Sequence, residues 1–464
     1  MRKNWQAVSS ENSKQSLPEL RPRILLVPDW LQWITGTIAK AIKAHNPDLE
    51  ADIVPMGVVQ MAIQKGWNPS EQFDVVHFLT TQATERAGAS LLGKIPAATT
   101  MHHIHDEADL THDLRGDAIM VSCSQWENDL LRRGVSGGKI VRVPYGVETR
   151  DFRPPSVRER ETARKAWGLD PNEVAIGFVG KKGSDNFGRK GFDIFCAGIL
   201  ALREKGVRAV PMILGSGWQE DLQKNLGKEF RAVHQPFVPQ QSVFYHAMDY
   251  YWVASRIEGG PVPLLEAMAS GIPCLARPVG MVEDVLTNQL SDWVVRSDRP
   301  TEFADKTATW VESSRLRQEA ARAARDRIVE AFDWSISAPK ALALYQKAWD
   351  LFQGQKRADL AWRQPDVGRR ESFLGSLDQV ETMIRIPRSI RGVSRFREDS
   401  NMVNELFRVK NRQTASALAL RLAIQYPEKA PHLLANILLN AWIRPSRMAL
   451  GRWKQKILKN MFQK

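Results

Sequence analysis

Short runs of apolar and β-branched residues alternate with helical patterns along most of the chain, and this alternation limits the possible folds more than any other feature. Continuous apolar strands separated by helices are typical of parallel sheets that are covered on both faces. The sequence therefore predicts an α/β protein with two Rossmann-like, doubly wound domains that face each other. The predicted strands are residues 23–28, 51–56, 73–79, 97–102, 118–123 and 140–146 in the first domain, and residues 174–180, 209–215, 232–238, 250–255, 273–277 and 293–297 in the second.

A chain of 464 residues is too long for one ordinary hydrophobic core, so more than one domain is expected. The stretch FRPPSVRERE, which begins at residue 152, is rich in proline and charge, as a linker between domains should be. We therefore expect a polar, disordered lead at residues 1–20, a first domain at residues 21–152 and a second domain at residues 153–353. The pattern changes at residues 354–464, which are predicted to form a basic helical extension.

The net charge of +13 lies entirely in this extension, where 22 Lys and Arg face 9 Asp and Glu. A basic amphipathic helix suits an anionic membrane surface or the phosphates of a nucleic acid, and a solvated extension that packs on the body is the alternative. No run approaches the roughly 18 apolar residues that a membrane span needs. Because the N-terminus also lacks the apolar core of a signal peptide, we expect a cytoplasmic protein, with peripheral membrane association as an option.

Two glutamates, Glu258 and Glu266, bracket the stretch EGGPVPLLE, which follows a predicted strand and opens a predicted helix. The backbone amides of Gly259, Gly260 and Val262 lie at the helix start, where the helix dipole favours a phosphate. A phosphate repels a carboxylate, so the glutamates are better suited to accept hydrogen bonds from hydroxyls. The pattern predicts a ligand with a diphosphate in the middle and a polyol at each end, which is the layout of a nucleotide-sugar.

This stretch is similar to the E-x7-E signature of retaining GT-B glycosyltransferases, and the chain resembles glycosyltransferase family 4 over roughly residues 22–352. The resemblance implies a GT-B fold and a closing helix at residues 332–352 that packs back on the first domain. Further segments that agree with the family in the same order are VPYGVETRDFRP (143–154), GFVGKKGSDNFGRKGFD (177–193), ILGSGW (213–218) and FDWSISAPKALALYQKAW (332–349).

The resemblance implies a role for each matching residue. Glu266 would hold the ribose hydroxyls of the donor, and Glu258 would contact the transferred sugar. Lys190 would neutralise the diphosphate, helped by Lys181, which stands where the family usually has arginine. Gly36, at the start of the first helix, would let the donor phosphate approach backbone amides.

His102 ends a predicted strand where family members carry a functional histidine near the reacting sugar carbon, and His103 is the alternative choice. Thr35 and Pro261 depart from the family, which often has glycine at both places, so one amide that could face the phosphate is missing at Pro261.

Two further patterns have two interpretations each. The stretch HHIHDEADLTHD, at residues 102–113, has the residue types of a metal site, but a polar loop with one working histidine is the favoured interpretation. Since no Asp-x-Asp triplet occurs either, we expect no metal and no other cofactor. Trp30 and Trp33, after the first strand, are expected either to stack on an acceptor sugar or base or to cover the core.

The predicted function is transfer of a sugar from a nucleoside-diphosphate sugar to a hydroxyl, with retention of configuration, and a glycan or lipid-linked sugar as acceptor. One alternative keeps the chemistry but uses modified DNA as acceptor, gripped by the basic extension. Another is a non-catalytic GT-B scaffold or binding subunit. A nicotinamide oxidoreductase is disfavoured, because no GxGxxG motif follows the first strand.

Overall fold

The structure is a computed structural model of the chain, and it describes residues 21–356 apart from residues 32, 65, 104–114, 183–187, 237 and 239. The predicted lead at residues 1–20 lies outside the described residues. So does the predicted extension from residue 357 onward.

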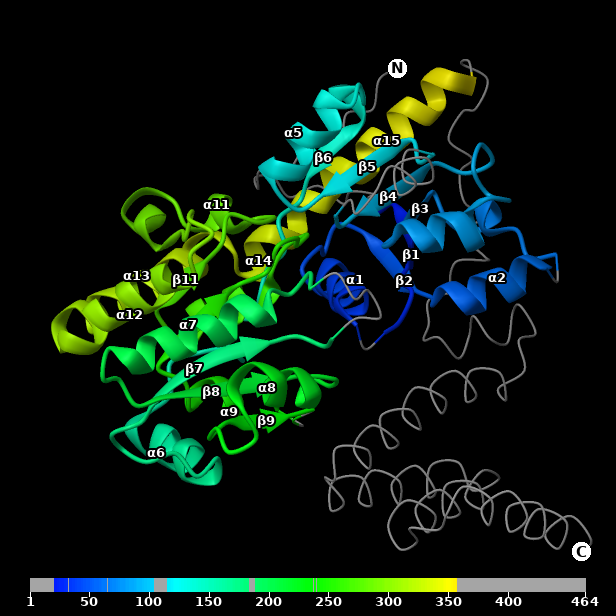
Figure 1. Ribbon diagram of the computed structural model, residues 1–464. Coiled ribbons are helices and arrows are strands. Elements are labelled where there is room, and N and C mark those ends of the chain that lie inside the picture. Colours follow the sequence, from blue (N-terminus) through cyan, green and yellow to red (C-terminus); the bar gives the residue numbers. More distant parts are fainter. Residues whose placement is uncertain are drawn as a thin grey trace, which may run out of the picture. The chain divides into compact units, whose positions relative to one another are not determined.

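A six-stranded, fully parallel sheet with the strand order β2-β1-β3-β4-β5-β6 forms the centre of the first domain (Figure 1). Its buried, apolar strands have helices between them. The strands are β1 (Arg23–Val27), β2 (Glu50–Ile53), β3 (Val75–Phe78), β4 (Ala97–Met101), β5 (Ala118–Val121) and β6 (Ile140–Arg142). The helices are α1 (Ile34–Ala44), α2 (Met56–Gln64), α3 (Thr81–Ala83) and α5 (Ser124–Arg132), with the short turns η1 (Pro69–Glu71), η2 (Thr84–Gly88) and η3 (Gly137–Lys139).

A second parallel sheet, with the order β11-β10-β7-β8-β9, forms the centre of the second domain. Its strands are β7 (Val174–Val179), β8 (Ala209–Leu214), β9 (Val233–Gln235), β10 (Tyr250–Val253) and β11 (Cys274–Ala276). Its helices are α6 (Val157–Ala166), α7 (Phe192–Glu204), α8 (Gln219–Leu226), α9 (Gln241–His246), α10 (Val262–Ala269), α11 (Val282–Val285), α12 (Thr301–Glu312) and α13 (Ser314–Ala331). The prediction of two doubly wound α/β domains is confirmed.

Eleven of the twelve predicted strands occur at their expected places, but the run at residues 293–297 is not a strand. The 3-10 turn η4 (Asn288–Trp293) ends there, and the chain then pairs with β11 only through an isolated bridge between Ala276 and Val294. Val294 and Val295 are nevertheless buried. The apolar pattern of this run therefore reflects burial beneath the sheet edge rather than strand pairing.

The second half of the predicted linker contains the residues that start helix α6. Ser156 and Glu159 form a capping box, in which each side chain accepts a hydrogen bond from the other residue's amide. Arg153 forms an ion pair with Glu159 at 2.6 Å. The helix of the second domain therefore starts directly after the connection from the first.

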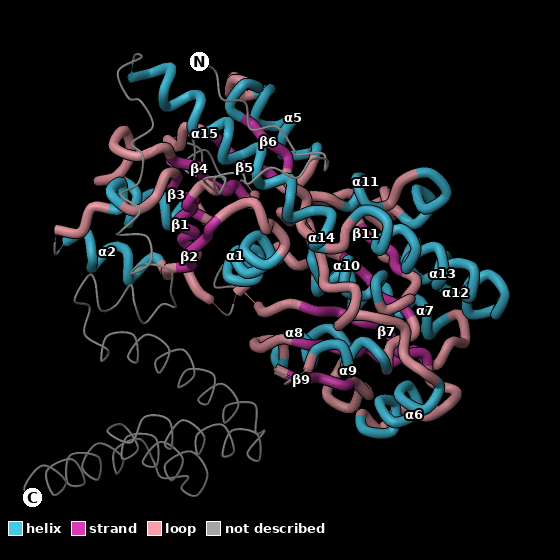
Figure 2. Tube along the Cα trace, turned by 180° about the vertical axis from the view of Figure 1, so that it is seen from behind, coloured by secondary structure: helices cyan, strands magenta, loops and turns pink. Residues whose placement is uncertain are grey.

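The chain returns to the first domain through α14 (Trp334–Ser337), η5 (Ala338–Lys340) and α15 (Ala341–Lys356), and α15 packs on β3, β4 and β5 (Figure 2). Tyr345 of α15 is buried, and its hydroxyl lies 3.0 Å from Nδ1 of His77 in β3. Nε2 of His77 lies 2.8 Å from the Thr100 hydroxyl in β4. Burial lowers the pKa of His77 to about 3, so this network joins the helix to the sheet without a charge.

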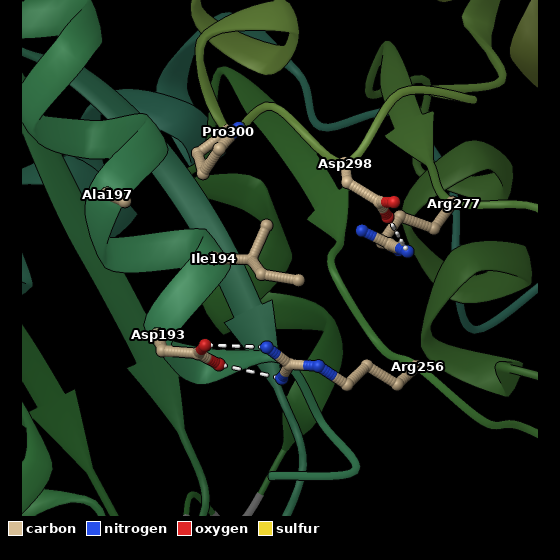
Figure 3. A pocket seen from close by; sticks show the side chains of 7 residues that line it. All are labelled: Asp193, Ile194, Ala197, Arg256, Arg277, Asp298 and Pro300. Atoms are coloured by element: carbon tan, nitrogen blue, oxygen red, sulfur yellow. Dashed lines mark hydrogen bonds and ion pairs between the residues drawn. The ribbon is translucent and has the colours of Figure 1, made fainter.

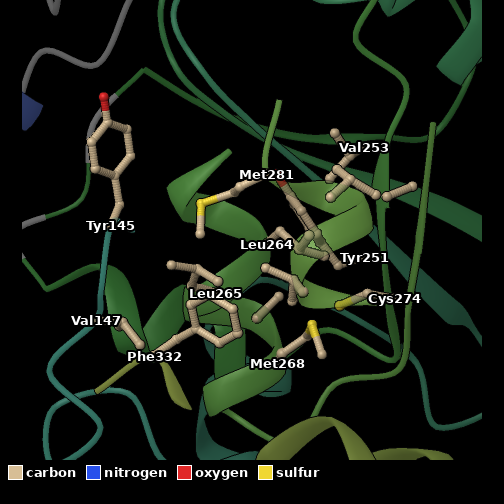
Figure 4. Close-up of a cluster of buried hydrophobic side chains, with 14 of the residues drawn as sticks. Tyr145, Val147, Tyr251, Val253, Leu264, Leu265, Met268, Cys274, Met281 and Phe332 are labelled. Carbon is tan, nitrogen blue, oxygen red and sulfur yellow. The ribbon is translucent and has the colours of Figure 1, made fainter. Parts of the chain in front are cut away.

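The apolar core of the second domain continues to the residues that come from the first. Leu264, Leu265 and Met268 of α10 pack in a buried cluster with residues of β10 and β11 (Figure 4). Tyr145 and Val147, which follow β6, lie in the same cluster. The helix that carries Glu266 is thus held by a core to which both domains contribute.

Candidate active site

In each sheet the order of strand addition reverses at one point, between β1 and β3 in the first sheet and between β7 and β10 in the second. Ligands of doubly wound sheets bind beyond the carboxyl ends of the strands at such a reversal. The loops after β7 and β10 carry Lys181, Lys190 and Glu258, and the loop after β1 leads into α1 with Gly36. The topology therefore places most of the sequence-predicted residues at the two points where a ligand is expected.

The loop between β10 and α10 buries the carboxylate of Glu258, whose exposure is 6%. Lys190 Nζ lies 2.6 Å from Oε1, the Ser255 hydroxyl donates to the same oxygen at 2.7 Å, and Arg189 lies 3.5 Å from Oε2. Burial raises the pKa of Glu258, but the two cations outweigh burial and the pKa lies below its ordinary value. The structure thus pairs two predicted site residues that are 68 positions apart.

The turn before α7 fixes the position of Lys190. Gly191 has a φ of 62°, in the left-handed region. A Cβ on Gly191 would lie 1.9 Å from the carbonyl oxygen of Ala254, at the end of β10. Only glycine allows this contact, and the turn then directs Lys190 past Gly180, at the end of β7, toward Glu258.

Gly259 and Gly260 let the loop approach the first domain. A Cβ on Gly259 would lie 2.3 Å from the carbonyl oxygen of His102, and a Cβ on Gly260 would lie 2.6 Å from the ring of Tyr145. The Gly259 carbonyl accepts a hydrogen bond from the Ser122 hydroxyl at 2.8 Å. These two glycines, whose amides were predicted to face a phosphate, therefore also allow close contact between the domains.

The start of α10 has fewer amide donors to offer a ligand than the sequence predicted. The Val262 amide donates to the Gly260 carbonyl at 2.8 Å, and the Leu264 amide donates to the Pro261 carbonyl at 2.8 Å. Pro261 and Pro263 have no N–H to offer. The role predicted for the Val262 amide is thus limited by its bond within the loop, and neutralisation of an anion here falls mainly to side-chain cations.

Glu266 lies about one helical turn into α10, eight residues after Glu258 of the preceding loop, and is half-buried. Its Oε2 accepts a hydrogen bond from the Tyr245 hydroxyl at 2.6 Å. Burial raises the pKa of Glu266 to about 7, against the smaller lowering by Tyr245. The site thus contains one carboxylate that is paired with cations and one that titrates near neutral pH.

Both ring nitrogens of His102 have partners. Nε2 lies 2.8 Å from the Leu79 carbonyl, which can only accept, so Nε2 carries the proton and Nδ1 accepts from the Tyr145 hydroxyl. Burial lowers the pKa of His102, although the Leu79 carbonyl and Asp29 act in the opposite direction. His102 is therefore a neutral, oriented group, and its carbonyl packs on Gly259. The alternative, His103, follows it and is half-buried.

Gly36 and Lys181 lie further from this centre. A Cβ on Gly36 would lie 2.3 Å from the Leu31 carbonyl, so glycine is needed here for the fold of the loop itself. Lys181 is exposed, directly after Gly180. The structure does not place either side by side with Glu258.

The sequence did not indicate which residues of the first domain hold the Glu258 loop and the neighbouring helix α11. Trp126 donates from Nε1 to the Glu258 carbonyl at 2.9 Å. Ser124, at the start of α5, donates from its amide and from its hydroxyl to Asp284, both at 2.7 Å. These partners are 132 and 160 positions apart, and no local pattern in the sequence indicates such contacts.

A pocket of about 560 Å³ lies beside this loop (Figure 3). Arg256 pairs with Asp193 at 2.6 Å, and Arg277 pairs with Asp298 at 2.9 Å. Because all four charged side chains are paired with one another, the pocket does not present a concentration of positive charge for a diphosphate. The full set of residues that line it is Asp193, Ile194, Ala197, Arg256, Arg277, Asp298 and Pro300.

Among the described residues, no group of three or more His, Cys, Asp or Glu is arranged to hold a metal ion. His105, which belongs to the possible metal pattern, lies outside the described residues. Between residues 21 and 356, no described helix combines the length and apolar character that crossing a membrane requires.

Residues 159–327 match the family described as glycosyl transferases group 1. The chain is 27% identical over 336 residues to a D-inositol 3-phosphate glycosyltransferase of Xylanimonas cellulosilytica, a match that covers 69% of this chain and 78% of that protein. It is also 27% identical over 233 residues to the lipopolysaccharide core biosynthesis mannosyltransferase LpsB of Rhizobium meliloti, covering 44% of this chain and 64% of that protein.

Solved structures with the same fold include Anabaena Alr3699/HepE in complex with UDP and glucose, with a TM-score of 0.59, 15% identity, and coverage of 70% of this chain and 98% of that one. A sucrose-phosphate synthase from Thermosynechococcus elongatus has a TM-score of 0.57 and 17% identity, and covers 71% of this chain and 100% of that one. At these identities, the likeness shows the fold, in which two doubly wound domains are joined as described above.

Proposed function

The chain is a GT-B protein with a glycosyl transferases group 1 domain, and from this we propose that it transfers a sugar from a nucleoside-diphosphate sugar to a hydroxyl of a glycan or lipid-linked sugar, with retention of configuration. The observation that carries the proposal is the Lys190–Glu258 pair at the strand reversal of the second sheet, with Glu266 eight residues after Glu258, in α10. The pair supplies a cation for a diphosphate and a carboxylate for sugar hydroxyls within one short loop.

Lys190 is the main cation for the diphosphate in this proposal. Its ammonium is held by Glu258 in the structure, and it turns to the diphosphate oxygens when the donor binds. Arg189 lies on the other oxygen of Glu258 and supports the same charge. Lys181 is exposed and free to swing toward the nucleotide. These cations take the neutralising role, and the proposed reaction requires no metal.

The two carboxylates act on hydroxyls. Glu258, released from part of its ion pair, accepts hydrogen bonds from the sugar, while Glu266 accepts them from the ribose. Because Glu266 has a pKa of about 7, its ionised form predominates above neutral pH and accepts most strongly there. The two carboxylates lie on either side of the start of α10, and a donor whose diphosphate lies between its sugar and its ribose fits this order.

The reaction breaks the bond between the anomeric carbon and the diphosphate oxygen, and the bonding electrons leave with that oxygen. Lys190 stabilises the negative charge that develops there. The acceptor oxygen forms its bond on the same face of the sugar, and its proton passes to the departing phosphate oxygen. His102 is neutral and fixed by two hydrogen bonds, so it orients the sugar rather than exchanging a proton.

The test is a thermal-shift panel of UDP, GDP, ADP, CDP and dTDP without added metal. A nucleotide at 100 times its dissociation constant stabilises the protein by about 2.7 kcal/mol. We expect one nucleotide to raise the melting temperature and Lys190→Ala and Glu266→Ala to abolish the rise. Lys205→Ala is the matched control, because Lys205 forms a surface ion pair with Asp305 at 2.7 Å.

Retention is tested separately by NMR of the product formed with the donor that this panel identifies. An anomeric proton coupling that matches the donor supports retention, and inversion contradicts it.

A non-catalytic scaffold is the second candidate, and the smaller number of amide donors at the start of α10 is the observation that favours it. If no nucleotide changes the melting temperature of the wild-type protein, the diphosphate site is vestigial and the scaffold replaces the enzyme.

A further inference from the structure

An exposed tryptophan lies on the loop that follows β1, beside a second tryptophan that is partly buried. The side chain of Trp33 is 55% exposed, and Ile34 beside it is 37% exposed. The ring of Trp30 lies 6.2 Å from that of Trp33, at an interplanar angle of 58°. Large apolar side chains are costly to leave in water, so an exposed tryptophan with a second indole ring beside it is a candidate for ligand contact.

The loop is ordered from within. Asp29 accepts hydrogen bonds from the Thr35 hydroxyl and, at 2.7 Å, from the Trp30 amide. The Leu31 carbonyl lies where only glycine at position 36 permits it to lie. These contacts bend the loop back on α1 and hold the tryptophans in place, which reduces the ordering cost when a ligand stacks on them.

The same loop lies at the carboxyl edge that faces the donor site. It follows β1, at the strand reversal of the first sheet (Figures 1 and 2). The Asp29 carboxylate is close enough to act on the pKa of His102, and the His102 carbonyl in turn packs on Gly259 of the Glu258 loop. The tryptophan pair therefore lies on a loop whose Asp29 is near His102, on the side of the first domain that packs on the Glu258 loop.

We propose that Trp33, backed by Trp30, is the platform on which a pyranose ring of the acceptor stacks, so that the acceptor is a glycan. This inference rests on the proposed function and names the acceptor class of the same site. A pyranose has a face of C–H groups that packs on an aromatic ring, while its hydroxyls remain at the edges for hydrogen bonds. Trp33 is thus a specificity-determining residue.

The charge of the loop argues against a phosphorylated polyol as acceptor. The relatives named above include an inositol phosphate glycosyltransferase and a lipopolysaccharide core mannosyltransferase, so their names span both acceptor classes. A phosphate acceptor calls for arginine or lysine at its site. The loop instead combines two indole rings with the Asp29 carboxylate, and the ammonium of Lys40 in α1 already donates to the Leu31 carbonyl at 3.2 Å. The indole rings therefore provide its main contact surface, which favours a neutral, ring-shaped ligand.

The experiment measures transfer by the full chain from the donor found in the thermal-shift panel. The acceptor probes are oligosaccharides ending in mannose, glucose, galactose or N-acetylglucosamine, and inositol 1- and 3-phosphate. For Trp33→Ala we expect the KM of the oligosaccharide to rise about tenfold, as for removal of one stacking ring, with the donor KM and acceptor-independent donor hydrolysis unchanged. Trp33→Phe keeps an aromatic ring, so its KM for the oligosaccharide is expected to stay close to that of the wild-type protein.

Leu131→Ala is the control, since Leu131 is a 43% exposed apolar residue of α5. The inference is overturned if Trp33→Ala leaves the oligosaccharide KM unchanged, if inositol phosphate is the acceptor used, or if the donor KM rises in its place, which would assign Trp33 to the nucleotide. Failure of the proposed function looks different, because the wild-type protein then neither binds a nucleotide nor hydrolyses a donor.

Discussion

Glu266→Gln is expected to stabilise the protein while it weakens donor binding. Burial raises the pKa of Glu266 to about 7 from an ordinary 4.5. One pKa unit corresponds to about 1.4 kcal/mol, which gives a full cost of about 3 kcal/mol for keeping this carboxylate ionised in the folded state. Since the side chain is half-buried, screening by solvent reduces this ionisation cost, and we expect Glu266→Gln to raise the free energy of unfolding by about 2 kcal/mol.

The sign and the pH range follow from proton linkage. Below pH 4.5 the carboxyl is protonated in both states and costs nothing. Between pH 4.5 and 7 the folded state holds a proton that the unfolded state has lost, so stability falls as the pH rises. Above pH 7 the cost is complete. Glutamine cannot ionise and therefore does not carry this cost, but its side-chain oxygen can still accept the hydrogen bond from Tyr245.

The assay is the melting temperature of the wild-type protein and of Glu266→Gln from pH 4 to pH 8. The gain of the variant should be absent at pH 4 and reach a few degrees at pH 8. Glu302→Gln is the matched control with the opposite sign, since its bonds from Ser297 outweigh burial and lower its pKa. A constant difference between Glu266→Gln and the wild-type protein across this range would refute the reasoning.

Three other substitutions test the contacts that build the site. Lys190→Ala leaves Glu258 buried with weaker partners and should cost about 3 kcal/mol in chemical denaturation, most of it recovered by adding Glu258→Gln. Gly259→Ala places a methyl group against the His102 carbonyl, so we expect a lower melting temperature and a larger radius of gyration in solution scattering. Tyr345→Phe removes the partner of the buried histidine in β3 and should cost about 1–2 kcal/mol, equally at pH 5 and pH 8, as denaturation at the two pH values would show.

The sequence predicted the fold because the two sheets are parallel and buried on both faces, so that each strand is a short apolar run of its own. The run at residues 293–297 shows where this reasoning fails. Its valines are as buried as those of a strand, but only Val294 pairs with the neighbouring strand, through a single bridge. Apolar character indicates burial but not strand pairing. Pairing along a strand requires an extended segment, and here the chain leaves the 3-10 turn η4 directly before the run.

The candidate site was predictable only in part. Glu258 and Lys190 stood out because their glycine-containing loops follow strand ends, and Glu266 stood out because it completes the E-x7-E pattern from within α10. These are local features. Trp126 and Ser124 did not stand out, because they act through contacts to the other domain that are defined by the assembled fold. The prediction for Gly259 and Gly260 was likewise incomplete. It assigned their amides to a phosphate, but both positions also need glycine for close contact with His102 and Tyr145.

The departures of this chain around α10 explain why its two central charges are paired. A diphosphate site made of backbone amides is preorganised without a ligand, because the amides are neutral dipoles fixed by the helix. Here Pro261 and Pro263 provide no N–H, and the Val262 amide is bonded within the loop, so side-chain cations carry more of the task. A buried lysine without its ligand needs a counter-charge. Glu258 supplies that charge, so in the proposed reaction the residue that would contact the sugar also keeps Lys190 in place until the diphosphate arrives.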